Sequence, residues 1–221
     1  LVTRNEEKAT AVARELTEQF RGSVRHYLAD FSDLHQVRET ADRIRQNEER
    51  IDILINSAGI HSTRRLYTSE GFELVFCVNH LASFVLTYRL IPRIKESPEG
   101  RIIQVNSQGH RFRGLDVEDL SWRRRRIYSG LRGHGASKTA QLLTVLELAD
   151  RLKGRSVTIN AMHPGDVRSA IGTNNGRLYN WYESRISGEA LHCLAADPAA
   201  RGVSGAYFNL SHREKPAPHA L

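Results

Sequence analysis

Three short stretches of small and polar residues stand where a ligand could be held. They are Asn-Ser-Ala-Gly at 56–59, Asn-Ser-Gln-Gly at 106–109 and His-Pro-Gly at 163–165, and each follows an apolar run typical of a strand. Open α/β sheets bind ligands beyond the carboxyl ends of their parallel strands, where small residues let the backbone approach a ligand closely. Each stretch alone is as compatible with a tight turn as with a site. Three of them along one edge of a sheet predict a binding site.

Hydrolytic and metal-dependent chemistry are less well supported. Ser107 and His110 lie close in sequence, but no Gly-x-Ser-x-Gly motif surrounds the serine, so a hydrolase nucleophile is not favoured. The ten histidines are scattered and form neither His-Glu-x-x-His nor a Cys/His cluster. We therefore predict no metal site.

Helical and strand patterns alternate from end to end and would position these stretches. Asn5 is a candidate N-cap with acidic residues in the turn that follows, and an apolar stripe at helical spacing follows Asp33. The expected strands cover 24–30, 51–56, 101–106, 157–162 and 207–210, and the expected helices cover 5–20, 33 to at least 44, 70–96, 134–152 and 189–195. This alternation predicts one α/β domain over residues 1–221, with a doubly wound parallel sheet of the Rossmann type.

The composition is that of an ordinary globular protein, with 40% hydrophobic and 26% charged residues. Two cysteines, Cys77 and Cys193, are too few for a secreted disulfide framework, so we expect a reduced, cytoplasmic location. No apolar run reaches about 18 residues without a charge. The longest candidate, 81–92, contains Arg89, and we predict no membrane span.

The net charge of +7 is partly local, because four consecutive arginines occupy 123–126. Such a run is either a solvated loop or a site for an anion such as a dinucleotide phosphate. Nucleic acid is not the expected partner, since no aromatic residues interleave these arginines.

Five segments taken together resemble the short-chain dehydrogenase/reductase family, especially its retinol-dehydrogenase-like members. They are 55–59, 78–81, 105–107, 129–138 and 163–169, in the order and spacing of the family's motifs. The resemblance implies hydride transfer between a nicotinamide cofactor and a small lipophilic carbonyl compound or secondary alcohol. By the same resemblance, Ser107 binds the substrate oxygen, Lys138 holds the nicotinamide ribose, and Asn79 supports a water that connects Lys138 to solvent.

The resemblance also implies where the cofactor binds. Arg4 follows the expected end of the family's second strand, where a guanidinium suits a ribose 2′-phosphate, so NADP is favoured over NAD. The other interpretation of Arg4 is a solvated residue at a helix entry. Asp30 and Phe31 resemble the pair that holds adenine. The implied cofactor-binding residues are Arg4, Asp30, Phe31, Asn56, Ala58, Gly59, Lys138, Pro164, Gly165, Val167 and Ser169.

The catalytic set departs from the family at one position. The family's acid/base is a tyrosine four residues before the lysine, and here that position is His134. Tyr128 lies ten residues before Lys138, ahead of the expected helix. An imidazole beside Lys138 and an oxidised nicotinamide would stay neutral, which suits proton acceptance in alcohol oxidation better than proton donation to a carbonyl. The implied catalytic residues are therefore Ser107, His134, Lys138 and Asn79; the alternative is a non-catalytic, cofactor-binding or regulatory relative.

A second departure concerns the start of the fold. The family's first strand, glycine-rich turn, first helix and most of its second strand have no counterpart in residues 1–221. We expect the strand at 24–30 to lack a partner, the sheet to show a gap, and an upstream βαβ unit of roughly 30 residues to complete it. The substrate and the oligomeric state leave no readable pattern in the sequence.

Overall fold

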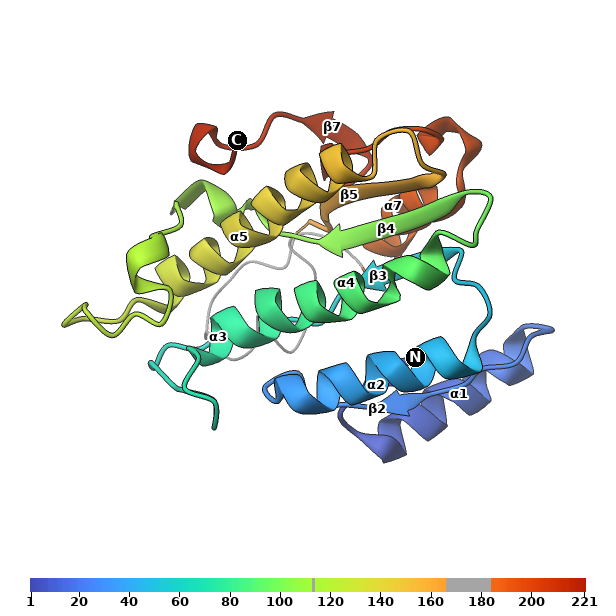
Figure 1. Cartoon of the computed structure of the whole chain (residues 1–221), viewed down its shortest axis with the longest axis horizontal. Helices are drawn as coiled ribbons and strands as arrows, with labels where there is room; N and C mark the ends of the chain where they lie inside the picture. The colour runs from blue at the N-terminus through green and yellow to red at the C-terminus, as the bar shows by residue number, and fades with distance from the viewer. Residues whose placement is uncertain (113, 166–183) are drawn as a thin grey trace.

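The protein, described from a computed structural model over residues 1–112, 114–165 and 184–221, is a layered α/β domain (Figure 1). Helices α4 and α5 lie in front of the main sheet, and α7 lies behind it. The helices are α1 (Glu6–Gln19), α2 (Leu34–Asn47), α3 (Leu74–Phe76), α4 (Ala82–Ile94), α5 (Gly130–Arg151) and α7 (Ser184–Ala196). The strands are β1 (Val2–Thr3), β2 (Tyr27–Leu28), β3 (Ile53–Asn56), β4 (Gly100–Val105), β5 (Val157–His163), β6 (Tyr207–Asn209) and β7 (His212–Glu214).

The main sheet has the order β3-β4-β5-β6-β7. The first four strands are parallel, as predicted, and β7 adds an antiparallel edge that the sequence pattern did not indicate. Asn56 is paired with Gln104, and Val105 with Met162, so β3, β4 and β5 end at one edge. The three polar stretches therefore meet there.

A separate two-stranded sheet lies beside the main one. Val2 pairs with Tyr27 and Thr3 with Leu28 in parallel register, so the prediction that the strand at 24–30 lacks a partner is wrong. Only two residues of that expected strand are paired, because the partner is itself two residues long. The predicted gap in the sheet is confirmed: a cavity of about 700 Å³ separates β1–β2 from β3 and is lined by residues from both. On β3, Ile53 is 42% exposed and Ile55 40% exposed.

Helix α1 forms through local signals rather than through burial. The Asn5 side chain accepts a hydrogen bond from the Lys8 amide at 2.8 Å, and acidic residues occupy the first turn, where the helix dipole favours them. Ala9 is the one buried residue of this helix, and Val12 is 43% exposed. The apolar side chain of Val12 therefore faces away from the core.

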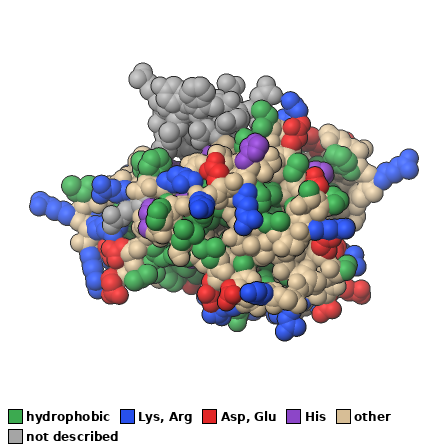
Figure 2. Space-filling model, turned by 90° about the horizontal axis from the view of Figure 1, so that it is seen from above, with side chains coloured by type: hydrophobic (Ala, Val, Ile, Leu, Met, Phe, Trp, Pro, Cys, Tyr) green, Lys and Arg blue, Asp and Glu red, His purple; other side chains and the backbone are tan. Residues whose placement is uncertain are grey.

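Charges of both signs are interspersed over the face shown in Figure 2, and no patch of one sign covers it.

The arginine run at 123–126 makes contacts within the domain. Arg125 pairs with Asp116 at 2.5 Å and stacks over Trp122 at 4.2 Å, and Arg123 lies 4.9 Å over the ring of Tyr67. These contacts favour a structural role for half of the run.

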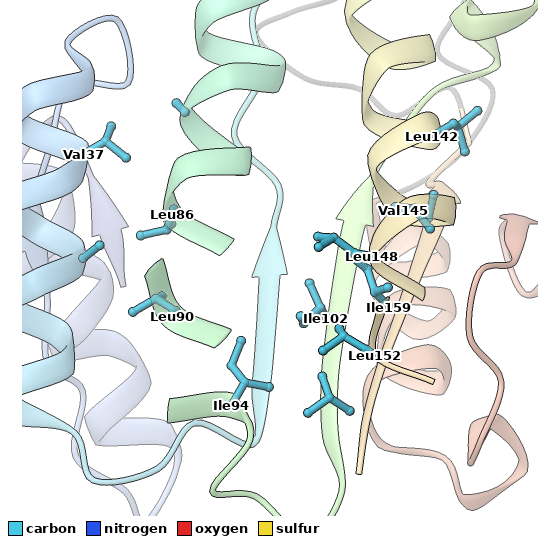
Figure 3. Packing of buried hydrophobic residues seen from close by; sticks show 14 of the residues in the cluster. Val37, Leu86, Leu90, Ile94, Ile102, Leu142, Val145, Leu148, Leu152 and Ile159 are labelled. Atoms are coloured by element: carbon cyan, nitrogen blue, oxygen red, sulfur yellow. The ribbon is translucent and has the colours of Figure 1, made fainter. Parts of the chain in front are cut away.

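The main core lies between the sheet and helices α2, α4 and α5 (Figure 3). Leu148 of α5 and Leu152, which caps its C-terminus, point towards Ile102 and Ile159 of the sheet, and all four are nearly inaccessible to solvent. Burying each such side chain contributes roughly 1.5–3 kcal/mol. A second cluster, including Met162, packs under α7 on the other face. Burial on both faces holds β4 and β5 rigidly in the middle of the domain.

One long helical stretch, Leu74–Ile94, runs through α3, a π-helical segment at Cys77–Leu81 and α4. By length and composition it could cross a membrane, but 56% of its apolar window is buried inside the domain. Arg89 within it donates to both carboxylate oxygens of Asp42 at 2.8 and 3.0 Å. This packing is that of a core helix, so the stretch is weak support for a membrane span.

Helix α5 begins four residues before the expected position. The Ser129 hydroxyl accepts a hydrogen bond from the Arg132 amide and caps the helix. A methyl group on Gly130 would collide with the Ser62 carbonyl oxygen, so glycine is required where this helix meets the loop after β3. This contact is tertiary, and the local pattern therefore did not indicate it.

Candidate active site

Among the described residues, the predicted cofactor-binding residues at the ends of β3 and β5 lie at one edge of the sheet, but they make different contacts there. The Asn56 amide donates to the Thr87 hydroxyl at 2.8 Å, so its side chain ties β3 to α4. Ala58 and Gly59 follow on the surface of the same edge. After β5, Gly165 has a φ of +79°, which glycine adopts without strain, and the Pro164 carbonyl accepts a hydrogen bond from Ser187. Val167 and Ser169 lie outside the described residues.

Asn79 lies in the π-helical segment, completely buried, and holds the loop after β3. Its Oδ1 accepts the Ile60 amide at 2.7 Å, and its Nδ2 donates to the Ile60 carbonyl at 3.1 Å. The same Nδ2 donates to the Ser137 hydroxyl at 3.1 Å and lies 3.4 Å from Nδ1 of His134. The π-helical turn thus places one amide at the junction of three elements, as such turns often do at functional sites.

His134 has a strongly altered ionisation. Burial, the Lys138 ammonium group and His61 together lower the pKa of His134 to about 3. A hydrogen bond to the Ile60 carbonyl raises this pKa, but by less. The Ile60 carbonyl only accepts, so one ring nitrogen must donate to it, whereas the Asn79 amide nitrogen that lies 3.4 Å from Nδ1 only donates. In the tautomer with its hydrogen on Nδ1, Nε2 of the neutral ring is free to accept a proton.

Ser107 and His134 border the same small space. A methyl group on Gly109 would lie 3.3 Å from Ser107 Oγ and 3.6 Å from His134 Nε2. The Gly109 amide donates to Ser107 Oγ at 3.0 Å, which leaves the hydroxyl hydrogen available to another acceptor. The Ser107 hydroxyl and the His134 ring can therefore both form hydrogen bonds with one oxygen atom that lies between them.

Lys138 is 5% exposed and lies one turn after His134 on α5. Burial lowers the pKa of its amine to about 7. The amine donates to the Val105 carbonyl at 2.8 Å and to Gln141 Oε1 at 3.1 Å. It is therefore held at the carboxyl end of β4, close to the Ser107 turn.

Gln141 is a buried residue of this network that the sequence analysis missed. Its Oε1 accepts from Lys138 and from the Asn106 amide, each at 3.1 Å, and its Nε2 donates to the Asn79 carbonyl at 2.6 Å. A polar residue three positions after Lys138 lies on the same helix face, and that spacing was the available signal. Gln141 thus connects Lys138 directly with Asn79.

Tyr128 does not replace the absent tyrosine. It precedes α5, as predicted, and its hydroxyl donates to the buried carboxylate of Glu73 at 3.0 Å. Burial and the Glu73 charge raise the pKa of this phenol above its ordinary value. Its proton is therefore held away from the Ser107–His134 space.

Arg4 and Asp30 lie together after β1 and β2, at the ends of the separate two-stranded sheet. Their closest side-chain atoms are 4.0 Å apart, and the Arg4 side chain is 79% exposed. Asp30 Oδ1 accepts from the amide and hydroxyl of Ser32, whereas Phe31 is half-buried against the core and lines the cavity. The structure thus brings these three residues together, apart from the Ser107–Lys138 cluster.

The short chain dehydrogenase family model matches residues 1–117, slightly more than half of the chain. Human retinol dehydrogenase 13 is 35% identical over 237 residues, which cover 100% of this chain and 71% of that protein. The chain belongs to the short-chain dehydrogenase family. Mouse retinol dehydrogenase 12 is 38% identical, over 81% of this chain and 59% of that protein.

Solved structures agree with this family assignment. A protein from Mycobacterium paratuberculosis has a TM-score of 0.76 at 29% identity, covering 99% of this chain and 76% of that chain. A short chain dehydrogenase from Salmonella enterica has a TM-score of 0.76 at 22% identity, covering 95% and 84%, which supports the fold alone. The predicted Rossmann-type fold and membership of the retinol-dehydrogenase-like group are confirmed.

Short-chain dehydrogenases use a nicotinamide dinucleotide, and the residues present fit the two ends of one. Lys138 offers a buried amine beside Ser107, where the ribose next to a nicotinamide would lie, and its present acceptors are a carbonyl and an amide that such hydroxyls could replace. Arg4 offers an exposed guanidinium beside Asp30 for the adenosine end. The chain is thus an NAD(P)-dependent oxidoreductase by family.

Proposed function

We propose that this short-chain dehydrogenase oxidises a lipophilic alcohol with NADP, using His134 as the proton acceptor in place of tyrosine. The observation that carries the proposal is the neutral His134 ring, whose Nε2 borders the same space as Ser107 Oγ. A general base must be unprotonated at the operating pH, and it accepts a proton more readily the closer its pKa lies to that pH. With a pKa of about 3, His134 is unprotonated throughout the neutral range but is a weak base.

The residues divide the work on the substrate. Ser107 donates its hydroxyl hydrogen to the substrate oxygen, where negative charge develops. His134 accepts the hydroxyl proton at Nε2 in the tautomer that carries its hydrogen on Nδ1 and donates it to the Ile60 carbonyl. When bound, the oxidised nicotinamide supplies the hydride acceptor for the electron pair of the carbinol C–H bond. The alcohol becomes a carbonyl compound, and one proton remains on the protein.

Lys138 and Asn79 support this step. Lys138 holds the cofactor ribose, and its charge adds to the burial that keeps the pKa of His134 low. Asn79 fixes the Ile60 peptide that orients the imidazole, and Gln141 links Asn79 with Lys138. The proton accepted by His134 would leave by the water that Asn79 supports.

The choice of cofactor and substrate rests on separate observations. Exposed Arg4 beside Asp30 suits a 2′-phosphate, and two structural neighbours, from Shigella flexneri and Escherichia coli, are complexes with NADP and NADPH. Several similar proteins are named for retinol, a lipophilic alcohol, and one from Streptomyces is named for a ketone of daunorubicin. We therefore propose NADP and a lipophilic alcohol or ketone pair, with the adenine held at Asp30 and Phe31 and the nicotinamide beyond Asn56 and Gly165.

The test compares alcohol oxidation and carbonyl reduction in two variants. His134→Phe keeps a ring but removes the base, and we expect its rate of alcohol oxidation at pH 7 to fall by roughly 10²–10⁴-fold. His134→Tyr supplies a phenol that can donate a proton, and we expect it to raise the rate of carbonyl reduction with NADPH. A panel of secondary alcohols and retinol, followed by NADPH absorbance, measures both rates.

Tyr128→Phe is the matched control, because Tyr128 carries a phenol near α5 but bonds to Glu73. It should leave both rates unchanged. If His134→Phe oxidises alcohols as fast as the wild type, or His134→Tyr leaves carbonyl reduction unchanged, the assignment of His134 is wrong. NADPH binding without turnover on any substrate would select the alternative, a cofactor-binding or regulatory relative.

A further inference from the structure

His110 lies completely buried between Ser107 and the C-terminal segment of the chain. Its Nδ1 is 2.7 Å from the Ser107 carbonyl oxygen, and its Nε2 lies 3.2 Å from the Ala217 amide nitrogen, which donates to it. A carbonyl oxygen only accepts, so Nδ1 must carry the hydrogen; an amide only donates, so Nε2 must be bare. Both contacts select the same neutral tautomer.

The surroundings of the ring keep it neutral and fixed. Tyr207 packs against it edge-on, with the ring centroids 4.8 Å apart. Burial lowers the pKa of His110, opposed by the Ser107 carbonyl. The charged or titratable groups that face it are Arg111, His219 and Glu214, of which only Glu214 favours protonation. A protonated ring would lose its contact with Ala217.

The C-terminal segment, residues 214–220, is attached to the same 3₁₀ turn, Gln108–Phe112, by further contacts. His219 Nε2 lies 2.7 Å from the His110 carbonyl oxygen, and Arg111 donates to the Lys215 carbonyl at 2.9 Å and to Glu214 at 3.2 Å. The segment is tightly packed at its end, where Ala217 is 5% exposed and Ala220 is fully buried. It is therefore part of the wall behind Ser107.

We infer that His110 is a positioning residue that links docking of the C-terminal segment to the placement of Ser107. The inference rests on the proposed function in one respect, the contact of Ser107 with the substrate oxygen. The turn that His110 anchors also supplies the Gly109 amide that holds Ser107 Oγ at 3.0 Å. A shift of this turn moves both the hydroxyl and its hydrogen-bond donor.

The first arm of the test needs no activity. Ala217 has φ −62° and ψ 147°, which proline adopts, so Ala217→Pro removes the amide donor, and its ring Cδ, placed where the N–H pointed, keeps the segment from docking on Nε2. We expect ¹⁵N spectra of wild-type His110 to show hydrogen on Nδ1 alone, and Ala217→Pro to change the Nε2 shift. Pro216→Ala keeps the Ala217 amide and serves as the matched control. Hydrogen on Nε2 in the wild type, or an unchanged spectrum in Ala217→Pro, would overturn the inference.

The second arm measures alcohol oxidation. His110→Phe keeps the ring contact with Tyr207 but loses both hydrogen bonds, and we expect kcat to fall roughly 10–100-fold with unchanged NADPH affinity. His110→Asn places an amide donor near the position of Nδ1, so it should recover part of that loss. Equal kcat in the wild type and both variants would overturn the inference. Ser107→Ala separates the two proposals: if it retains full activity while the ¹⁵N result holds, the proposed function fails and His110 still positions the turn.

Discussion

The buried amine of Lys138 follows the imidazole of His134 by one turn of α5, and both groups have pKa values far below their ordinary ones. Like charges and burial act in the same direction on His134, so its protonated form is strongly disfavoured in the folded protein. The stability of the fold therefore depends on whether His134 and Lys138 are protonated.

This relationship predicts how stability depends on pH. The pKa of His134 is about 3 in the folded protein, against an ordinary value of 6.5, so below pH 6.5 the unfolded chain binds a proton that the folded chain does not. Protonation of His134 in the unfolded chain therefore costs the protein no stability above pH 6.5. As the pH falls from 6.5 towards 3, it lowers the free energy of unfolding by at most about 1.4 kcal/mol per pH unit. Urea unfolding at pH 6.5, 5.5 and 4.5 should show a steeper loss for the wild type than for His134→Gln, which cannot titrate.

His80, whose pKa is also lowered, to about 4, titrates in both proteins and cancels from the comparison. Parallel slopes for the two proteins would mean that His134 is protonated as easily in the folded as in the unfolded chain. That result would contradict the proposed state of the site.

The network around Gln141 predicts a large effect from a small change. Gln141→Leu preserves approximate volume but leaves the Lys138 amine, the Asn106 amide and the Asn79 carbonyl each without one partner. Unsatisfied buried polar groups cost roughly 1–3 kcal/mol each, so we expect the free energy of unfolding to fall by about 2–4 kcal/mol. Gln46→Leu, at an exposed position of α2, is the control and should change stability by less than about 0.5 kcal/mol. Similar losses in both variants would show that the Gln141 contacts add no stability.

Gln141 also shows how far the sequence could be interpreted. The strand ends at Asn56, Ser107 and Gly165 follow from apolar runs that stop at small residues, and the structure places all three at one edge. The role of Gln141 follows from three contacts made by different elements. The three-residue spacing from Lys138 indicates that Gln141 lies on the same face of the helix, but it does not indicate which groups Gln141 contacts.

The same limit explains the errors in the fold. The two-residue strand β1 is too short to leave a periodic pattern, so its pairing with β2 could not be predicted. The hairpin to β7 consists of polar residues whose partners lie on β6. The early start of α5 depends on close contact between Gly130 and Ser62, which no local preference encodes.

Arg4 predicts cofactor selectivity. Its side chain is 79% exposed and its guanidinium is loosely paired with Asp30 at 4.0 Å, so it is available for a 2′-phosphate. We expect Arg4→Asp to weaken NADPH binding roughly 10–100-fold, because it removes a charge-assisted contact and adds repulsion, while NADH binding changes little. Cofactor fluorescence titrations measure both affinities.

Arg21→Asp is the matched control, since it alters the net charge equally at another exposed position. If both variants weaken NADPH binding equally, the effect is one of net charge. If neither does, the 2′-phosphate contact lies elsewhere in the chain.

The cavity between the two sheets predicts how the domain could be stabilised. Ile53 and Ile55 are each about two-fifths exposed on β3, and both line the cavity. A parallel strand between β1 and β3, joined to Leu1 by a helix in a right-handed crossover, would pair the open strand edges and cover the isoleucines. We expect a fused segment of roughly 30 residues, an apolar strand followed by an amphipathic helix, to raise the free energy of unfolding by about 2 kcal/mol or more. The same segment with serines in its strand is the control, and urea unfolding measures both proteins.

A second experiment locates the added strand. Ile53→Ser should lower the free energy of unfolding more in the extended protein than in residues 1–221, because only there does the side chain become buried. Equal costs in the two backgrounds would show that the added strand does not occupy the cavity.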